Sequence, residues 1–539
     1  MPPSIARYWP WLVVLIVLLF VGFIRVRLLE MPLERDEGEY AYAGQLILQG
    51  VPPYEQVYNM KWPGTYYAYA LGMAVFGQTS AGVHLTLLAA NSLTILFVFL
   101  LGRSLFGATA GLAACASYGV MSVSPSVLGL AAHANHFVVL FAVPATWLLW
   151  KADASDERRA WFISGLLYGL AVLMQQQGLY FCLFGWVFLF WRAVQNKTAA
   201  AGFWRRAAAF GLGMILPFGF FGLSCVVAGT FTRFWIWTVT YARWYAGLVG
   251  PTMGMGFLAK HLRKTLEISA GFWLLALGGL LLACVHKPSR TPAVFLAGFW
   301  LFSFLGAAAG FYFREHYFIL VLPAFALLAG LGVAQFQRVL QRIQRKTAAI
   351  ILPLVFFALV LGWAVVCQAR VFFQLSARGA CEAIYSHNPF VEAVSVADYI
   401  REHSGSEARV VVAGSEPEIY FYARRYSATG YIYTYALMEP QPAARAMQQE
   451  MIAEIEAAKP EYLVSVSYYL SWLSHPDSDR MIFDWLQQYT GSHYELAGVV
   501  FRNAAGAVES DWGNLAKNQN ALQGDYITVY KRKPDELNR

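Results

Sequence analysis

Charge is scarce in this sequence. Asp, Glu, Lys and Arg together make up 13% of its 539 residues, and 58% of the residues are hydrophobic. Soluble domains carry about 25% charged residues, so the composition excludes an ordinary soluble protein and indicates a polytopic α-helical membrane protein in a lipid bilayer. The formal net charge is +8, but no basic run is interleaved with aromatic residues and no nucleic-acid motif is present. We therefore expect no nucleic-acid partner.

Cysteine is also sparse, with six residues in the chain. None of them belongs to a Cys-x-x-Cys pair, and the first five lie in apolar stretches, where a cysteine is usually a small buried hydrophobe. The C-terminal third lacks a glycine-rich phosphate loop of the required spacing. The sequence thus predicts neither a metal site nor a disulfide framework, and no cofactor. Whether a divalent metal takes part stays open.

Long apolar stretches dominate the first 370 residues. A bilayer span takes roughly 17–25 residues, and about eleven stretches qualify: 10–29, 80–103, 107–125, 131–150, 161–175, 178–194, 207–229, 268–285, 292–311, 317–335 and 347–368. Tyr66–Phe76 is apolar but too short to cross, which favours a re-entrant or interfacial segment. We interpret 230–267 as a long aromatic loop.

Basic residues indicate the orientation of these spans. They collect after spans four, six, eight and ten, for example at Lys151, Arg192, Lys287 and Arg338. Positive charge marks short cytoplasmic loops, so we expect a cytoplasmic N-terminus in a bacterial inner membrane. The first loop, 30–64, and the C-terminal region would then be periplasmic.

The composition changes near residue 370. Short apolar runs at Arg409–Ala413, Glu461–Val466, Val499–Phe501 and Tyr526–Tyr530 predict strands, and Gln441–Ala458 predicts an amphipathic helix that ends before Pro460. Strands that alternate with helices are typical of a small α/β domain. We therefore divide the chain into a transmembrane domain at 1–369 and a soluble domain at 370–539.

An acidic cluster directly follows the first predicted span. Glu34, Asp36, Glu37 and Glu39 place four carboxylates within six residues. Charge near a bilayer is costly and commonly marks function, although a solvated interfacial loop would also explain it.

Several motifs resemble one family. Arg35–Tyr42 contains the pair Asp36-Glu37, Asn59–Gly64 contains Lys61 and Pro63, and Phe313–Phe318 precedes the tenth span. These motifs resemble the membrane glycosyltransferases that use a polyprenyl-phosphate sugar donor, the protein O-mannosyltransferase and aminoarabinose-transferase-like group, which share the fold called GT-C. The resemblance implies transfer of a hexose or pentose to an extracytoplasmic lipid, glycan or protein. A transporter or flippase and an inactive envelope-assembly scaffold remain alternatives.

The resemblance also implies roles for single residues. Asp36 would be the general base, with a pKa raised by partial desolvation, and Glu37 or Glu39 would orient substrate. Lys61 and Arg314 would bind the donor phosphate. The remaining substrate-binding candidates are Tyr40, His316 and Tyr317.

Two histidines at the entrance of the fourth span raise the question of a metal. His133 and His136 lie three positions apart, a spacing that metal ligands can have. With no cysteine or clustered acid beside them in the sequence, we interpret them as a packed or interfacial pair and predict no metal there.

Overall fold

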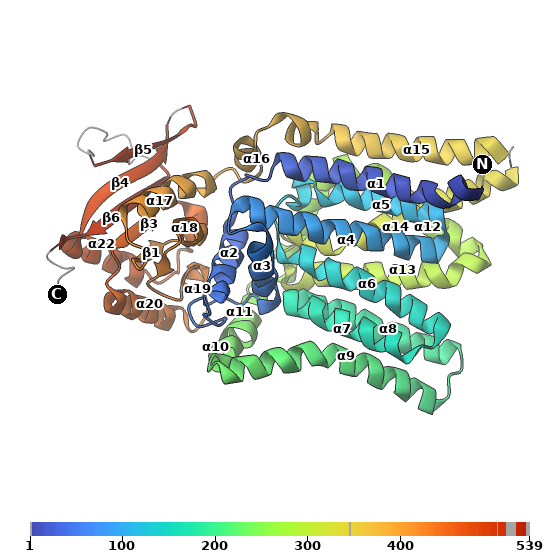
Figure 1. The fold of residues 1–539 in the computed structure, drawn as a ribbon, viewed down its shortest axis with the longest axis horizontal. Helices are drawn as coiled ribbons and strands as arrows, with labels where there is room; N and C mark the ends of the chain where they lie inside the picture. The colour runs from blue at the N-terminus through green and yellow to red at the C-terminus, as the bar shows by residue number, and fades with distance from the viewer. Residues whose placement is uncertain (1–2, 344–345, 504, 514–523, 535–539) are drawn as a thin grey trace.

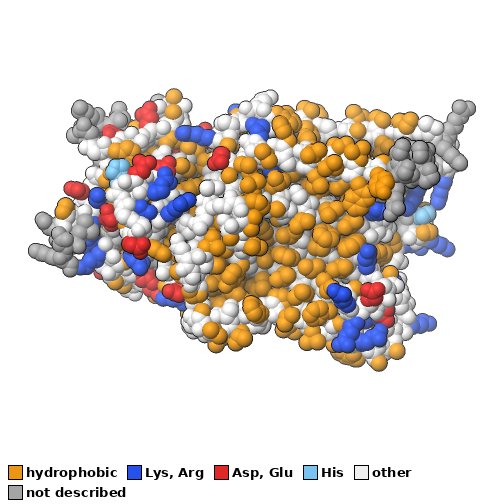
Figure 2. Space-filling model, viewed as in Figure 1, with side chains coloured by type: hydrophobic (Ala, Val, Ile, Leu, Met, Phe, Trp, Pro, Cys, Tyr) orange, Lys and Arg blue, Asp and Glu red, His pale blue; other side chains and the backbone are white. Residues whose placement is uncertain are grey.

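The computed structural model describes residues 3–343, 346–503, 505–513 and 524–534. It has two parts, a bundle of long helices and a C-terminal domain built on a sheet (Figure 1). Apolar side chains cover most of the bundle in Figure 2, whereas charged side chains gather over the C-terminal domain and the opposite end of the bundle. This distribution is the one expected of a multi-pass membrane protein.

Each predicted span coincides with one long helix of the bundle. These helices are α1 (Pro3–Arg27), α4 (Ser80–Phe106), α5 (Ala108–Ser122), α6 (Ala134–Ser155), α7 (Arg158–Met174), α8 (Leu179–Gln195), α9 (Ala200–Val227), α12 (Pro251–Val285), α13 (Lys287–Ala308), α14 (Leu322–Ile343) and α15 (Lys346–Val366). Within the described ranges, nine helices are long and apolar enough to cross a membrane. Helices α5 and α7 have 15 and 17 residues, so the predicted count of eleven spans is not established.

The first loop contains a helix, which corrects the sequence-based prediction of a loop throughout 30–64. Helix α2 (Arg35–Leu48) contains the acidic cluster, and α3 (Pro63–Phe76) contains the short apolar segment. Glu34 caps α2 and exchanges hydrogen bonds with Glu37 in a capping box. The cluster is buried, so it is not a solvated loop. Both helices lie between the bundle and the C-terminal domain (Figure 1).

The segment 230–267 is also helical, although we expected a loop. It comprises α10 (Phe231–Trp235), a π-helical turn (Ile236–Tyr241), α11 (Ala242–Ala246) and the first half of α12. Its aromatic residues pack against the first loop and the C-terminal domain. For example, Trp237 stacks on Tyr58 and contacts Tyr431.

The C-terminal domain contains a mixed six-stranded sheet in the order β2-β1-β3-β6-β4-β5. Its strands are β1 (Arg409–Ala413), β2 (Tyr426–Ser427), β3 (Tyr462–Val466), β4 (Tyr494–Arg502), β5 (Val508–Trp512) and β6 (Tyr526–Arg532). Strand β1 pairs in parallel with β2 and β3, and the other pairs are antiparallel. All four predicted strands are confirmed, and the predicted helix is α20 (Ala444–Ala458).

The C-terminal domain is anchored on α2 by a close backbone contact and a buried ion pair. A Cβ atom on Gly38 would lie 2.6 Å from the backbone nitrogen of Glu418, the first residue of α18 (Glu418–Ala423). Arg35 donates to Glu416 at 2.9 Å, and both side chains are buried. The first turn of α2 is therefore held against the segment Glu416–Glu418 by both contacts.

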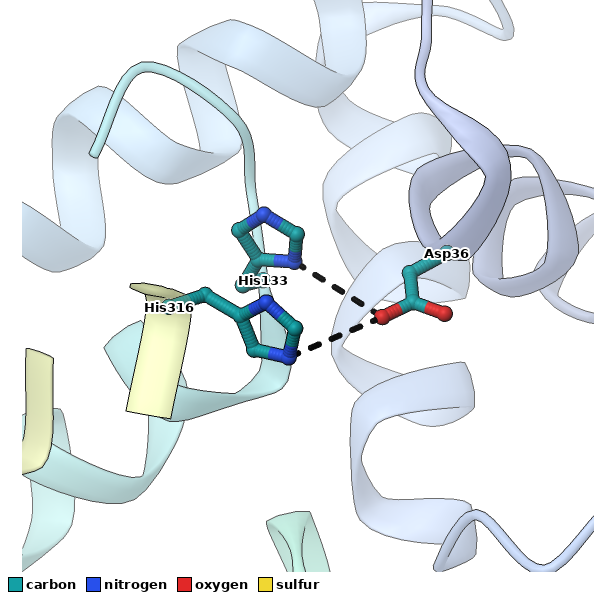
Figure 3. Close-up of side chains that lie close together, drawn as sticks. All are labelled: Asp36, His133 and His316. Carbon is teal, nitrogen blue, oxygen red and sulfur yellow. Dashed lines mark ion pairs between the residues drawn. The ribbon is translucent and has the colours of Figure 1, made fainter. Parts of the chain in front are cut away.

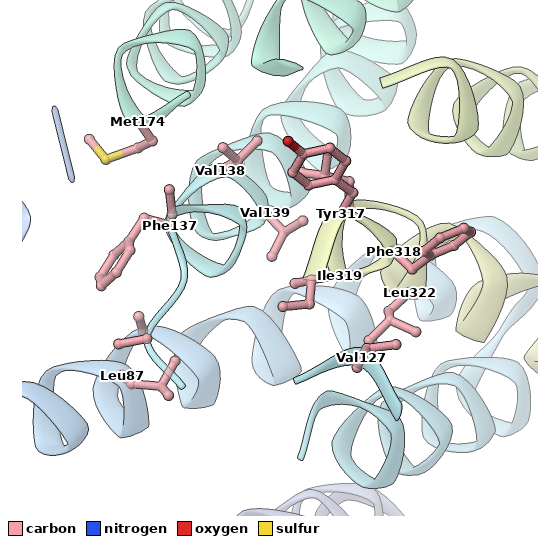
Figure 4. Packing of buried hydrophobic residues seen from close by; sticks show 14 of the residues in the cluster. Leu87, Val127, Phe137, Val138, Val139, Met174, Tyr317, Phe318, Ile319 and Leu322 are labelled. Carbon is pink, nitrogen blue, oxygen red and sulfur yellow. The ribbon is translucent and has the colours of Figure 1, made fainter. Parts of the chain in front are cut away.

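A hydrophobic core supports the segments beneath this junction. Val139 of α6 lies beside Ile319 of the 3₁₀ helix Glu315–Leu320 (Figure 4). Close packing of such side chains, and not their removal from water, stabilises contacts between helices in a bilayer. This packing fixes the segment that carries His316.

Candidate active site

Asp36 lies in the first turn of α2 and faces a polar pocket, which we call the Asp36 pocket. Its Oδ1 atom is 3.2 Å from Lys61 Nζ and accepts a hydrogen bond from Tyr433 at 3.5 Å. Its Oδ2 atom is 3.8 Å from His133 Nδ1 and 4.0 Å from His316 Nε2. The pocket is further lined by Asn59, Tyr245, Arg314, Tyr317, Tyr435 and Glu439, and its free volume is about 50 Å³.

The pKa of Asp36 differs from the sequence-based expectation. Burial alone would raise it, but Lys61 and further cationic groups, Arg314 among them, outweigh burial and hold the pKa of Asp36 below its ordinary value. Asp36 is therefore an anion at neutral pH. The expected raised pKa was wrong because a lysine distant in sequence forms an ion pair with it.

His133 pairs with His316 rather than with His136. The two rings stack with centroids 4.2 Å apart and an angle of 12° between their planes, and both point a nitrogen at Asp36 (Figure 3). Burial lowers the pKa of His133 and of His316, which favours the neutral rings that can stack in this way. Both His133 and His136 are buried, as expected of packed residues, but the ring partner of His133 is His316 and not His136.

Asp36, His133 and His316 could each offer one ligand atom to a metal. However, a metal prefers to lie in the plane of each imidazole that binds it. The two planes are nearly parallel and stacked, so their lone pairs run side by side instead of converging. The arrangement suits hydrogen bonds to an anion better than a metal, and one ring would have to turn to complete a metal site.

Glu37 and Glu39 point away from the Asp36 pocket. Glu37 is fully buried, accepts a hydrogen bond from the backbone N–H of Ala132 at 2.6 Å, and lies 3.2 Å from His84. These contacts hold the segment that leads to His133. Glu37 is thus placed to position the site and not to touch a ligand in the pocket.

Glu39 holds the turn that carries Lys61. It accepts hydrogen bonds from Tyr66 at 2.6 Å and Asn59 at 2.8 Å. Burial raises the pKa of Glu39 to about 8, with Lys61 opposing and Asp36 adding to the rise. Tyr40 is buried, and the Nζ atom of Lys61 lies 5.5 Å from its ring centroid. The Tyr40 ring therefore packs against the Lys61 ammonium group.

The other predicted residues do meet at the pocket. Lys61, Arg314, His316 and Tyr317 all line it, although they come from segments more than 250 positions apart. Arg314 donates to Tyr245 at 3.3 Å. The cations and Asp36 therefore face one space.

Sequence reasoning missed the lining residues from the C-terminal domain. Tyr433, Tyr435 and Glu439 reach the pocket from around α19 (Tyr435–Met438). Glu439 accepts a hydrogen bond from Tyr241 at 2.5 Å, and burial raises its pKa to about 7. The tyrosine-rich run 431–435 is a visible signal, but nothing in it shows which residue it would face.

Comparison with known proteins supports the fold. Residues 61–221 match the family described as dolichyl-phosphate-mannose-protein mannosyltransferase. The undecaprenyl phosphate-alpha-4-amino-4-deoxy-L-arabinose arabinosyl transferase of Pseudomonas aeruginosa strain UCBPP-PA14 is 32% identical over 145 residues, which span 25% of this chain and 26% of that protein. The chain thus matches only about a quarter of the length of this curated relative.

Two solved structures are similar over nearly the whole chain. ArnT from Cupriavidus metallidurans, solved with undecaprenyl phosphate, has a TM-score of 0.61 at 15% identity and covers 97% of this chain and 98% of its own. The oligosaccharyltransferase AglB from Archaeoglobus fulgidus, solved with an inhibitory peptide and a dolichol-phosphate, has a TM-score of 0.54 at 13% identity and covers 96% and 75%. The chain therefore has the GT-C fold of the polyprenyl-phosphate-dependent membrane glycosyltransferases and carries, in residues 61–221, the sequence pattern of the mannosyltransferase family.

Proposed function

We propose that this protein is an integral-membrane glycosyltransferase that moves a hexose or pentose from a polyprenyl-phosphate donor to an extracytoplasmic acceptor. The observation that carries the proposal is the ion pair of Asp36 and Lys61 in a pocket that Arg314 also lines. A base beside two cations is what glycosyl transfer from a phosphate requires.

In the proposed reaction, an acceptor hydroxyl oxygen attacks the anomeric carbon of the donor sugar. The bond from that carbon to the phosphate oxygen breaks, and the phosphate keeps the electron pair. Lys61 and Arg314 neutralise the charge on the leaving phosphate. The hydroxyl proton passes to Asp36. A single carboxylate that acts on the acceptor side fits inversion at the anomeric carbon.

The ion pair couples donor binding to the basicity of Asp36. Lys61 is the strongest influence that lowers the pKa of Asp36. A donor phosphate beside Lys61 partly neutralises the lysine charge. Lys61 then offsets less of the effect of burial, so the pKa of Asp36 rises. Asp36 thereby becomes a better base when the donor is in place.

We further propose that the chain lies in a bacterial inner membrane with the Asp36 pocket and the C-terminal domain on the periplasmic side. The basic loops after the even-numbered spans support this orientation. We assign residues 1–369 to the transferase domain and 370–539 to a domain that covers the pocket with Tyr433 and Tyr435. Tyr317 and the His133–His316 stack would hydrogen-bond the phosphate or sugar.

The test uses full-length protein in liposomes with radiolabelled undecaprenyl-phosphate pentoses and hexoses, and membranes of a strain that lacks the protein as the source of acceptor. Transferred label and released undecaprenyl phosphate are both measured. General base catalysis contributes about 10²–10⁴-fold, so Asp36→Asn should lower turnover by roughly that factor. Asp398→Asn changes an exposed carboxylate and should leave turnover unchanged.

Glu37→Gln should cost less than Asp36→Asn, since Glu37 positions the site. No transfer by the wild type from any donor, or near wild-type turnover by Asp36→Asn, would contradict the proposal.

A further inference from the structure

A cavity of about 590 Å³ lies beside the Asp36 pocket. We call it the interdomain cavity, because its walls come from the first half of α12, the segment Tyr312–Glu315 and the C-terminal domain. Arg314, Tyr435 and Glu439 line both this cavity and the Asp36 pocket. The two spaces therefore meet at these three side chains.

The cavity is richer in cations than in free carboxylates. Lys260 and Lys264 lie one helical turn apart on α12 and both line it, together with Arg314. Of its two carboxylates, Glu315 lies 3.9 Å from Lys264, and Glu439 already accepts a hydrogen bond from Tyr241. A ligand with a negative charge is thus favoured over a neutral or cationic one.

One histidine in this wall has a buried ring nitrogen without a hydrogen-bond partner among the described residues. His261 is only 5% exposed, and its Nδ1 atom has no hydrogen-bond partner among the described residues. One face of its ring stacks on Phe318 at 3.9 Å. The His261 ring lines both the interdomain cavity and a second, mostly apolar cavity, and its unpartnered nitrogen is itself buried, so a ligand would reach that nitrogen only after the side chain turned.

The same wall is apolar toward the start of α12. Met253 and Phe257 are 53% and 39% exposed and line the cavity. The second half of α12 carries the apolar span, so the cavity lies near the level where this helix leaves the bilayer. Exposed apolar side chains one to three turns from lysines match an amphiphile.

We propose that the interdomain cavity binds the acceptor and that the acceptor is an anionic lipid, with its head group at Lys260 and Lys264 and its acyl part along Met253 and Phe257. The inference rests on the proposed function. Two substrates must reach Asp36 by separate routes, and Lys61 already serves the donor phosphate. The junction at Arg314, Tyr435 and Glu439 then leads an acceptor hydroxyl from the cavity to Asp36.

Binding is tested with full-length protein in phosphatidylcholine nanodiscs. The probes are dioctanoyl phosphatidylglycerol, dioctanoyl phosphatidylcholine, inorganic phosphate and undecaprenyl phosphate, and the dissociation constants are measured by native mass spectrometry. The double variant Lys260→Ala/Lys264→Ala should weaken phosphatidylglycerol binding about tenfold and leave undecaprenyl phosphate unaffected. Lys61→Ala should show the reverse pattern.

Arg263→Ala is the matched control. Arg263 is an exposed cation between the two lysines on α12 and is not among the residues that line the cavity. Its removal should change no dissociation constant by more than about twofold. Equal loss in this control, equal affinity for phosphatidylcholine, or loss of undecaprenyl phosphate in the double variant would each overturn the proposal. If inorganic phosphate bound as tightly as phosphatidylglycerol, the phosphate group alone would account for binding, and the proposal of a lipid ligand would be wrong.

The transfer assay identifies the acceptor class separately. Label recovered in a lipid that chromatography separates from the undecaprenyl-phosphate donor, and reduced at low acceptor concentration by the double lysine change, supports the inference. Label in protein or soluble glycan overturns it while leaving the proposed function intact. Lysine-dependent lipid binding without any transfer would instead refute the proposed function.

Discussion

At the scale of single residues, position in space decides what each carboxylate of the acidic cluster does. Asp36 faces Lys61 and stays ionised. Glu37 and Glu39, one and three positions later, turn inward and accept hydrogen bonds from Ala132, Tyr66 and Asn59. The sequence alone does not distinguish the roles of these acids, because each role depends on the face of α2 that the residue occupies and on partners distant in the sequence.

Lys61→Ala should raise the pKa of Asp36. Without the lysine, burial dominates in the donor-free enzyme, so the acid limb of the pH profile of kcat/KM for the donor should move to higher pH. The size of the shift is read from initial rates between pH 4 and pH 8. Arg263→Ala should leave the limb in place, and an unmoved limb in Lys61→Ala would show that Asp36 is not the base.

Glu439 should make anionic-lipid binding depend on pH. Its raised pKa of about 7 reflects burial, with Tyr241 and Arg314 opposing. Below pH 7 the carboxyl is neutral, and above it the carboxylate repels an anion, so the affinity for phosphatidylglycerol should fall as pH rises through 7. Glu439→Gln should flatten this part of the curve, measured at pH 6, 7 and 8. A slope that persists in the variant would show that Glu439 is not the group responsible.

At the scale of elements, α2 is the helix that links the bundle to the C-terminal domain. Its first turn supplies Asp36, Arg35 binds Glu416, and Gly38 touches the backbone of α18. A helix this short and acidic does not resemble a core element in a sequence. Its burial follows from the C-terminal domain, which supplies the contacts about 380 residues later.

Gly38→Ala should loosen this junction. The added methyl would meet the Glu418 backbone at 2.6 Å, and such overpacking costs about 1–3 kcal/mol. Thermal unfolding of the detergent-solubilised protein should show a lower midpoint, together with lower turnover. Gly22→Ala is the control, because nothing lies within 4 Å of a Cβ there. An unchanged midpoint in Gly38→Ala would mean that the domain can shift without loss.

At the scale of the whole molecule, the sequence predicted the helices of the bundle and the strands well. Apolar length and alternation are local properties, and each predicted span overlaps a helix. The helices within 30–64 and 230–267 were missed because their apolar stretches are too short or too interrupted by polar residues to be predicted as membrane spans. The pocket residues Tyr433, Tyr435 and Glu439 were missed because only the folded chain brings them to Asp36.

The proposed orientation predicts a protection pattern. Protease added to spheroplasts should cleave the C-terminal domain, for instance at exposed residues near Arg480, and spare the basic segment after α14. Lysed spheroplasts provide the control in which both are cut. Cleavage only after α14 in intact spheroplasts would reverse the topology and remove the periplasmic active site.

The small free volume of the Asp36 pocket affects whether the sugar is transferred to the acceptor or to water. About 50 Å³ leaves room for a few water molecules. Water is the nucleophile that competes with any acceptor for an activated sugar. A pocket lined by Tyr433 and Tyr435 admits few water molecules, so hydrolysis of the donor would be slow. The lipid-linked sugar would then stay intact until an acceptor binds. The tyrosines would then matter less for how fast the sugar moves than for where it goes.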